Sequence, residues 1–399
     1  MIPATTPHTI LCLNSGSSSL KFALYRIEQD QEALLMRGLA DRIGFPGGRL
    51  YARDGDNRVT ANDEVKFANH AAACQAIMDV LSREDTPQPQ AIGHRVVHGG
   101  PNYAAPQRVD AALLSALRDL IRFAPLHLPS ALTIMEALGA RHSEVPQVAC
   151  FDTAFHRRMP EVAQRLPLPS YLWDQGVRRY GFHGLSYEFI LESLGTGHRG
   201  RTVIAHLGNG ASMAAVMDGR PVDTTMSFTP TSGLVMGTRC GDLDPGAVIY
   251  LMRERGYGPD ELNDLLNFRS GLVGVSGFSS DMKTLLEHRE NAPSAAMAVS
   301  LFCYQARKFI GALAAAMGGL DLLVFTGGIG ERAAPVRFEI CQALEFLGVQ
   351  VDERRNAAGA DVISATTSRC AVRVIPTNEE LMIARHTTRL LHSDGVAKP

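Results

Sequence analysis

Residues 10–25 read ILCLNSGSSSLKFALY, in which two apolar runs flank a short turn of small residues. Residues 203–216, VIAHLGNGASMAAV, repeat this plan in the second half of the chain. Asn, Gly and Ser between two extended runs predict a β-hairpin in each place. Because glycine carries no side chain, backbone N–H groups in such turns can converge on an anion. Two hairpins of this kind, facing each other, would contact a polyphosphate from both sides. The sequence therefore predicts a duplicated, two-lobed phosphotransferase.

Side chains that suit phosphate surround the first turn. Ser17, Ser19 and Lys21 provide two hydroxyls and an ammonium group, which are good ligands for phosphate oxygens. An ordinary surface turn is the alternative for either hairpin taken alone, since the same residue types favour exposed turns. The chain has no G-x-x-x-x-G-K-[ST] loop and no protein-kinase H-R-D or D-F-G set, so it is neither a Walker-type protein nor a protein kinase.

Length and composition indicate a globular enzyme. The chain has 399 residues, enough for two or three domains, and 45% of them are apolar. Its formal net charge of −2 argues against a nucleic-acid partner, which normally requires a basic surface. The seven cysteines form no C-x-x-C pair, and their odd number argues against a disulfide scaffold.

No segment predicts a membrane span or an export signal. The most apolar long stretch, residues 310–325, is interrupted by Gly318, Gly319 and Asp321, so it is too broken to cross a bilayer. Met1 to His8 lacks the basic region and apolar stretch of a signal peptide. We therefore expect no membrane partner and a location in the reducing cytoplasm.

Apolar periodicity predicts strands that alternate with helices in both halves, which is typical of an α/β layered fold. Helices are expected at residues 66–83, 110–123, 130–138, 294–317 and 379–391. Strands are expected at residues 145–151, 322–325 and 372–375, and residues 91–100 are expected to form a short strand that runs into a turn rich in His and Gly. The boundary between the halves is expected near residues 152–160. Because no low-complexity linker separates the halves, we expect two lobes around a cleft.

One arginine in each half stands beside glycines. Arg95 lies in GHRVVHGG, residues 93–100, and Arg239 lies in GTRCGD, residues 237–242. A guanidinium group neutralises carboxylate and phosphoryl oxygens in pairs, and neighbouring glycines allow close approach. Either arginine alone fits a surface ion pair equally well. Their occurrence at glycine turns of both halves favours a clamp on an anion.

Histidines and carboxylates supply further candidates. Three histidines stand beside glycines, prolines or strand ends: His127, His183 and His206. His183, within the sequence YGFHG, is the most site-like, although a lone histidine is usually structural. Asp152 follows an apolar strand, where ligands bind in open α/β sheets. Glu380 opens the last expected helix and fits a helix-dipole partner as well as a ligand. The run GGIGE at residues 327–331 suits a nucleotide contact at a helix start.

Taken together, these motifs resemble the acetate/propionate kinase family of the sugar-kinase, actin and Hsp70 superfamily. The resemblance runs nearly end to end, through residues 14–21, 93–100, 151–156, 180–184, 206–212, 236–244, 325–331 and 377–380. It implies a two-lobed, duplicated ribonuclease H-like (actin-like ATPase) α/β fold with a central cleft. It also implies an N-terminal acyl-substrate lobe at residues 1–152, on which the tail 385–399 packs. Residues 153–384 would form a nucleotide-binding and dimerisation lobe.

The same resemblance implies a homodimer that performs direct, reversible phosphoryl transfer between ATP and acetate, giving acetyl phosphate and ADP, with Mg²⁺ or Mn²⁺. The catalytic residues would be Asp152, Arg95, Arg239, His183 and His127, of which His183 and Arg239 would stabilise the transition state. The substrate site would consist of Arg95, Val97, Leu126, Phe182 and Pro230. ATP would contact Lys21, Ser17, Ser19, His206, Asn209, Gly210, Gly328 and Gly330. Asn14 and Glu380 would hold the metal.

Two departures from the family pattern affect these expectations. Leu128 replaces a usual Asn and removes a polar neighbour of His127, while Arg332 replaces the usual Asn after Gly-Glu and changes a nucleotide contact. Two other functions remain open: a kinase for propionate or another short-chain acid, and a non-catalytic, nucleotide-sensing actin-like protein. The complete set of candidate arginines, histidines and carboxylates argues against a sensor, because a sensor does not need an acyl clamp.

Overall fold

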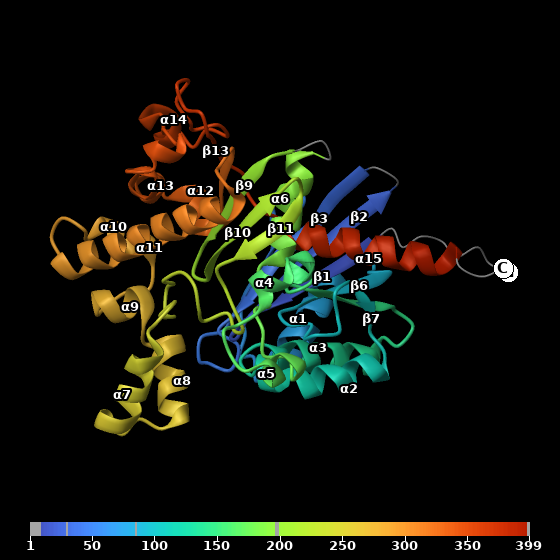
Figure 1. The fold of residues 1–399 in the computed structure, drawn as a ribbon. Helices are drawn as coiled ribbons and strands as arrows, with labels where there is room; N and C mark the ends of the chain where they lie inside the picture. The colour runs from blue at the N-terminus through green and yellow to red at the C-terminus, as the bar shows by residue number, and fades with distance from the viewer. Residues whose placement is uncertain (1–8, 29–30, 84–85, 196–198, 397–399) are drawn as a thin grey trace. The chain divides into compact units, whose positions relative to one another are not determined.

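The computed structural model describes residues 9–28, 31–83, 86–195 and 199–396. Met1 to His8, for which the sequence predicts no signal peptide, lie outside these ranges. The chain divides into two compact units. Unit 1 comprises the residues up to Ala154 together with the segment from Asn378 onward, and unit 2 comprises Phe155–Thr377. Each unit is built around its own β-sheet (Figure 1).

The sheet of unit 1 has eight strands in the order β5-β4-β3-β2-β1-β6-β8-β7. These are β1 (Thr9–Ser15), β2 (Ser19–Glu28), β3 (Gln31–Asp41), β4 (Arg49–Asp54), β5 (Val59–Glu64), β6 (Ala91–Val96), β7 (Gln107–Arg108) and β8 (Gln147–Phe151). The predicted first hairpin is present as the antiparallel pair of β1 and β2. On its other side β1 runs parallel to β6, and β6 runs parallel to β8.

The sheet of unit 2 has five strands in the order β11-β10-β9-β12-β13. These are β9 (Arg201–Leu207), β10 (Ala211–Met217), β11 (Arg220–Thr224), β12 (Leu322–Thr326) and β13 (Ala371–Val374). The predicted second hairpin is the antiparallel pair of β9 and β10. Strand β9 then runs parallel to β12, and β12 runs parallel to β13. The order and directions repeat those of β3-β2-β1-β6-β8, which confirms that the fold is duplicated.

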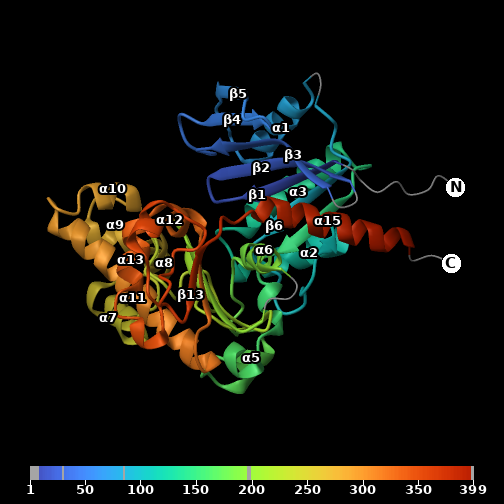
Figure 2. The same cartoon turned by 90° about the horizontal axis from the view of Figure 1, so that it is seen from above.

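Four helices and one 3₁₀ helix cover the sheet of unit 1. They are α1 (His70–Leu81), α2 (Ala111–Asp119), the 3₁₀ helix Leu120–Phe123, α3 (Leu128–Arg141) and α15 (Glu379–Val396). Helix α15 packs along β1 and β6 (Figure 2). A side chain at Gly93 of β6 would come within 2.4 Å of Ile383 and 2.5 Å of Thr387. Glycine at this position therefore lets α15 lie directly on the sheet.

The helices of unit 2 are more numerous and several are short. They are α4 (Glu161–Gln164), α5 (Ser170–Asp174), α6 (Gly184–Leu194), α7 (Pro245–Arg255), α8 (Pro259–Phe268), α9 (Gly271–Ser276), α10 (Met282–Glu287), α11 (Pro293–Met317), α12 (Gly327–Arg332), α13 (Ala334–Cys341) and α14 (Glu353–Ala357), with 3₁₀ helices at Phe155–Arg158 and Glu345–Leu347. Helix α11 packs on β9, β10 and β11. Helix α6 contributes Tyr187 and Ile190 to a core cluster with Ile204 of β9.

Within the ranges that the structure describes, no helix is long and apolar enough to cross a membrane. The apolar stretch 310–325 supports this result, because it is divided between the end of α11 and the buried strand β12. Gly318 ends α11 in the left-handed conformation, with φ of 73°, and separates the two elements.

Candidate functional site

Three of the predicted polar residues lie at one edge of the unit 1 sheet. Asn14 is near the end of β1, Arg95 is near the end of β6, and Asp152 follows β8. Since these three strands are parallel neighbours, their carboxyl ends meet at the same edge, where open α/β sheets bind ligands. Glu379 and Glu380 form the first turn of α15.

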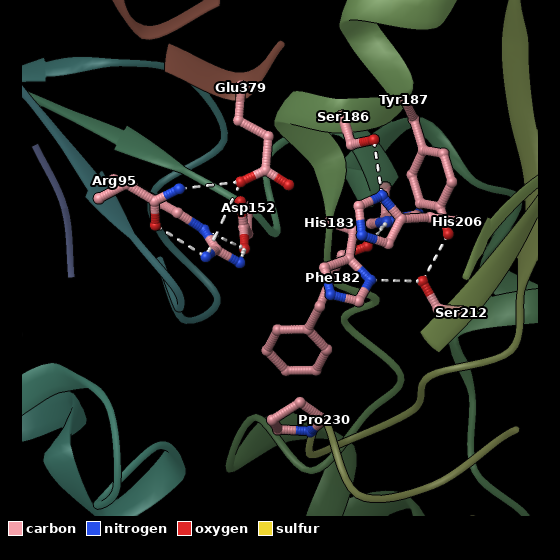
Figure 3. A network of polar contacts seen from close by, with 12 residues as sticks. Arg95, Asp152, Phe182, His183, Ser186, Tyr187, His206, Ser212, Pro230 and Glu379 are labelled. Atoms are coloured by element: carbon pink, nitrogen blue, oxygen red, sulfur yellow. Dashed lines mark hydrogen bonds and ion pairs between the residues drawn. The ribbon is translucent and has the colours of Figure 1, made fainter. Parts of the chain in front are cut away.

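Arg95 is the centre of this group (Figure 3). Its Nε and Nη2 atoms donate to Oδ2 of Asp152 at 2.9 and 2.5 Å. Nη1 donates to Oδ1 of Asn14 at 2.9 Å and lies 3.9 Å from a carboxylate oxygen of Glu379. Burial alone lowers the pKa of Arg95, but the charges of Asp152, Glu379 and Glu380 raise it well above its usual value. The guanidinium is therefore a permanent cation, held in one orientation.

Asn14 connects the arginine to the start of α15. Its Nδ2 atom donates to Oε2 of Glu379 and to Oε1 of Glu380, both at 3.1 Å. Glu379 did not enter the predicted site, because its neighbour Glu380 gave the same helix-start signal. The shared hydrogen bonds from Asn14 place both carboxylates at the same polar edge.

A capping interaction fixes where α15 begins. Oδ1 of Asn378 accepts a hydrogen bond from the backbone N–H of Leu381 at 3.0 Å, as an N-cap residue does. The hydroxyl of Tyr25 donates to the same oxygen at 3.1 Å. Burial raises the pKa of Tyr25 above its usual range, so the phenol remains a neutral donor. Strand β2 thus holds the helix start that carries the two glutamates.

The first hairpin turn is braced from α1. The ring Nε2 atom of His70 is hydrogen-bonded to the carbonyl oxygen of Gly16 at 2.9 Å, and the N–H of Gly16 donates to the carbonyl of Ser19 at 2.8 Å. Ser17 is exposed, and Lys21 is exposed on β2 opposite Asn14. The turn is therefore ordered while its hydroxyl and ammonium groups remain accessible.

Two further predicted residues of unit 1 stand at the start of α3. His127 immediately precedes this helix and is half-buried, as is Leu126. Val97 directly follows β6 and is 7% exposed. Leu128, which stands where the family usually has Asn, is fully buried. Its side chain therefore belongs to the apolar core of the unit.

In unit 2 the most constrained candidate is His183. It precedes α6 in the left-handed conformation, with φ of 59°, which is uncommon for a residue other than glycine. Its Nδ1 atom is hydrogen-bonded to Oγ of Ser212 on β10 at 2.8 Å. Tyr187 of α6 reaches the same Oγ atom with its hydroxyl at 2.5 Å. Neither Ser212 nor Tyr187 belonged to the predicted site.

His206 of β9 stacks on His183 (Figure 3), with ring centroids 4.3 Å apart and planes inclined by 20°. Its Nδ1 atom is hydrogen-bonded to Oγ of Ser186 at 2.8 Å. Ser186 of α6 therefore contacts the ring of His206 directly, and Tyr187 of the same helix connects to the ring of His183 through Ser212. The structure brings both predicted histidines of unit 2 together.

The second hairpin turn lies beside His183 and Arg239. A side chain at Gly210 would lie 3.4 Å from Nε2 of His183 and 3.6 Å from Nη1 of Arg239. Arg239 donates from Nη1 to the carbonyl of Pro230 at 3.0 Å. The carbonyl of Asn209 accepts from the N–H of Gly237 at 3.0 Å. A guanidinium nitrogen and an imidazole nitrogen thus lie beside the glycine of this turn.

A pocket of about 580 Å³ adjoins this turn. Its lining residues are Gly208, Asn209, Asp281, Met282, Lys283, Leu286, Glu287, Gly328, Ile329, Arg332, Ala333 and Pro335. Its volume falls within the usual range for small-molecule sites. Gly328 is exposed at the start of α12, whereas Gly330 is buried against β9 and β12. Phe182 is also buried, and Pro230 is half-buried.

The duplicated α/β fold, the polar sheet edge of unit 1 and the donor-lined turn and pocket of unit 2 define a small-molecule phosphotransferase class. The chain belongs to the acetokinase family, whose model matches residues 9–385.

Three comparisons show how similar the chain is to known members. An acetate kinase of Rhodopseudomonas palustris is 46% identical over 400 residues, covering 97% of this chain and 98% of the relative. The crystal structure of Porphyromonas gingivalis acetate kinase superposes with a TM-score of 0.86 at 37% identity, covering 96% of this chain and 99% of that one. A propionate kinase from Francisella tularensis superposes with a TM-score of 0.89 at 36% identity, with the same coverage.

Proposed function

We propose that the protein is an acetate kinase, which transfers the terminal phosphoryl group of ATP directly to acetate and gives acetyl phosphate and ADP in a reversible reaction. Membership of the acetokinase family supports this function. The observation that carries the chemistry is the convergence of His183 and Arg239 on the turn at Gly210. Two donors aimed at one small volume suit the charge that develops on a transferring phosphoryl group.

The polar edge of unit 1 suits the acyl substrate. Arg95 is a fixed cation with its guanidinium held by Asp152 and Asn14, so it can neutralise a carboxylate without reorganising. Acetate is deprotonated at pH 7, so its attack requires no general base. The reaction then depends on alignment and on charge neutralisation. Asp152 aligns the reacting groups through Arg95. We assign contacts with the acyl substrate also to His127 and Leu126 of unit 1 and, separately, to Phe182 and Pro230 of unit 2.

The second hairpin and its pocket suit ATP. Asn209 and Gly328 line the pocket, and the backbone of Gly210 lies beside the converging donors. We assign the β- and γ-phosphates to this turn together with His206, and the nucleoside to the pocket beside Gly328 and Gly330. Ser17, Ser19 and Lys21 of the first turn complete the phosphate contacts.

The residues present fit a magnesium ion. Glu379 and Glu380 offer hard carboxylate oxygens, and both accept from Nδ2 of Asn14. Oδ1 of Asn14 accepts from Arg95 in this structure, so the amide would turn its oxygen toward a bound ion. Mg²⁺ is usually held by one or two carboxylates together with phosphate oxygens of the substrate. When bound, Mg²⁺ or Mn²⁺ would neutralise charge on the phosphate oxygens. We propose Asn14 and Glu380 as its protein ligands.

Chelation and one substitution test this metal site. We expect exhaustive EDTA treatment to abolish acetyl phosphate formation and added Mg²⁺ to restore it. Glu380→Gln should raise the Mg²⁺ concentration that gives half-maximal rate, because the variant loses an anionic ligand. Glu353→Gln is the matched control, since Glu353 also occupies the first turn of a helix and is exposed. An unchanged Mg²⁺ dependence in Glu380→Gln would remove that residue from the metal site.

The preferred acid depends on the space beside Arg95. The likeness to a propionate kinase structure makes propionate the second candidate substrate. Val97 is nearly buried and stands two residues after Arg95 in the sequence, and we propose that its branched side chain occupies volume that a further methylene would need. Since one methylene in an apolar pocket changes kcat/KM by about 10- to 200-fold, we expect acetate to be preferred over propionate and butyrate.

Val97→Ala should improve propionate relative to acetate, because it opens space for one methylene. The measurement is kcat/KM for both acids, with Val59→Ala as the control, since Val59 is 53% exposed in the same unit. A ratio unchanged by Val97→Ala would exclude this residue as the determinant of chain length.

A hydroxamate assay with C1 to C4 acids and ATP tests the proposed activity itself. The expected result is acyl hydroxamate formation that is fastest with acetate and requires ATP. Equal kcat/KM for acetate and propionate would replace the proposal by a broad short-chain acid kinase. Nucleotide binding without acyl phosphate formation would instead favour a sensor.

We further propose that the protein is a cytoplasmic homodimer. The cytoplasm agrees with its seven cysteines, all of which are free, since disulfides are rare in that compartment. Helix α7 has no buried residue and exposes Ile249, Tyr250 and Met252, at 48, 53 and 45%. Contiguous exposed apolar groups are typical of an interface, and a second copy of α7 would supply a self-complementary partner.

Light scattering after size exclusion tests the dimer. The wild type is expected at twice the chain mass of 43.2 kDa. Tyr250→Glu should reduce the mass to that of one chain, because it places a charge in the apolar surface. Val162→Glu, at an 84% exposed position of α4, should leave the mass unchanged. A wild type that elutes as a single chain would refute the proposed assembly.

A further inference from the structure

A chain of hydroxyl groups ends on the ring of His183. The hydroxyl of Tyr187 lies 2.5 Å from Oγ of Ser212, and the same Oγ atom lies 2.8 Å from Nδ1 of His183. Both Tyr187 and Ser212 are fully buried. Buried polar groups are normally hydrogen-bonded, so the proton positions along this chain are coupled.

The chemistry of the three groups favours one direction for the hydrogen bonds. A serine hydroxyl has one proton to donate and two lone pairs to accept. A phenol is the more acidic hydroxyl, which favours Tyr187 as the donor to Oγ of Ser212. In that arrangement Ser212 directs its own proton at Nδ1 of His183. In a neutral imidazole one nitrogen accepts and the other carries the proton, so the proton of His183 lies on Nε2.

The Nε2 atom is the one that faces the proposed phosphate turn. It lies 3.4 Å from the position of a side chain at Gly210, and Nη1 of Arg239 lies 3.6 Å from the same position. The described titratable and charged groups of unit 2 near the ring include His206, stacked at 4.3 Å, and Arg239, and Tyr187 connects to the ring through Ser212. A neutral ring with a proton on Nε2 can donate toward this volume without adding a second cation beside the guanidinium.

The backbone shows independently that the ring is held in place. His183 is one of five residues other than glycine with positive φ in the described part of the chain. Such a conformation is unfavourable for a residue with a side chain and persists only where the surroundings determine it. The N–H of Tyr187 donates to the carbonyl of His183 at 3.1 Å, so backbone and side chain of Tyr187 both anchor this residue.

We propose that Ser212 and Tyr187 are positioning residues that hold His183 as a neutral imidazole with its proton on Nε2, directed at the transferring phosphoryl group. The inference rests on the proposed function for the identity of that group. The tautomer itself is a property of the free enzyme.

Nitrogen-15 NMR on protein labelled only at histidine tests the tautomer without any substrate. Long-range proton–nitrogen correlations distinguish a protonated from an unprotonated ring nitrogen, and the spectrum of His183→Gln identifies the signals of this ring. We expect Nε2 to be protonated and Nδ1 to be unprotonated in the wild type. In Ser212→Ala the Nδ1-protonated form should appear. A wild-type ring that is protonated at Nδ1 would overturn the proposal.

Kinetics test whether the two residues act through His183. Ser212→Ala and Tyr187→Phe should each lower kcat about tenfold, the effect of one hydrogen bond, with little change in KM for ATP or acetate. In the His183→Gln background, Ser212→Ala should cause no further loss, since the group it positions is absent. Ser193→Ala is the control, because Oγ of Ser193 on the same helix donates only to the carbonyl of Phe189 in the described contacts.

Two outcomes would contradict the positioning role. Ser212→Ala with wild-type kcat would show that the hydroxyl chain does not matter for turnover. Equal losses in the wild-type and His183→Gln backgrounds would show a general structural effect. Failure of the proposed function is distinguishable, because the wild type would then form no acetyl phosphate while the NMR spectrum still reported the Nε2 tautomer.

Discussion

Replacing Arg239 by alanine is expected to lower kcat for acetyl phosphate formation by about 10²–10³-fold, the usual effect of removing one preorganised electrostatic contact. Its Nη1 atom donates to the carbonyl of Pro230 and lies 3.6 Å from the sulfur of Met236. Because the proposed role of Arg239 is in the reaction and not in folding, we expect the variant to remain folded. The measurement is kcat by the hydroxamate assay, with the thermal unfolding midpoint recorded on the same samples.

Arg354→Ala is the matched control, because Arg354 is exposed on α14 of the same unit and should tolerate the change. Near-normal turnover of Arg239→Ala with acetate would refute the proposed role of this guanidinium. A loss of activity accompanied by an equal loss of folded protein would show that Arg239 is structural.

Replacing Arg95 by alanine is expected to reduce both activity and stability. The loss in kcat should again be about 10²–10³-fold. In addition, Asp152 is 0% exposed and would lose its cation, and breaking a buried ion pair by removing one partner costs about 3–5 kcal/mol. Equilibrium denaturation with urea measures the free energy of unfolding, and the hydroxamate assay measures kcat.

Arg95→Lys separates the two effects. Lysine restores a positive charge beside Asp152 but cannot reproduce the separate hydrogen bonds to Asp152 and Asn14. We expect most of the stability to return while kcat stays low. Full recovery of kcat in the lysine variant would show that charge alone matters, and unchanged stability in Arg95→Ala would contradict the buried ion pair.

The fold could be predicted because its deciding signals are local. Apolar runs around short Asn, Gly and Ser turns specified both hairpins, and the apolar strands 145–151 and 322–325 specified the parallel neighbours. The observed helices begin within a few residues of the predicted starts, and the differences lie where a capping residue or a proline sets the first turn. Asp110 accepts from the N–H of Leu113 at 2.7 Å and lies outside α2 as its N-cap. Pro129 occupies the first turn of α3, which begins at Leu128.

The site of unit 1 was predicted residue by residue, but its connections were not. Asn14, Arg95 and Asp152 each stand near a strand end, which the sequence shows. Helix α15 brings Glu379 to Asn14 because it packs closely on the sheet where Gly93 faces Ile383. These two segments are far apart in the chain. No local pattern reports such a contact.

In unit 2 the missing information was also non-local. His183 was predicted from its glycine neighbours, but its hydrogen bonds to the N–H of Tyr187 and to Oγ of Ser212 were not. Ser212 lies within an otherwise apolar strand, where an isolated hydroxyl gives no functional signal. A buried serine in the same hairpin as the proposed phosphate turn is the feature that could have drawn attention to it.

Phosphorus NMR on a reaction with oxygen-18 acetate tests the central claim most directly. Direct transfer to the acetate carboxylate predicts acetyl phosphate whose phosphorus carries one oxygen-18 from the acid, with ADP as the only other phosphorus product. AMP and pyrophosphate, or ADP with unlabelled inorganic phosphate and no acetyl phosphate, would contradict phosphoryl transfer to acetate.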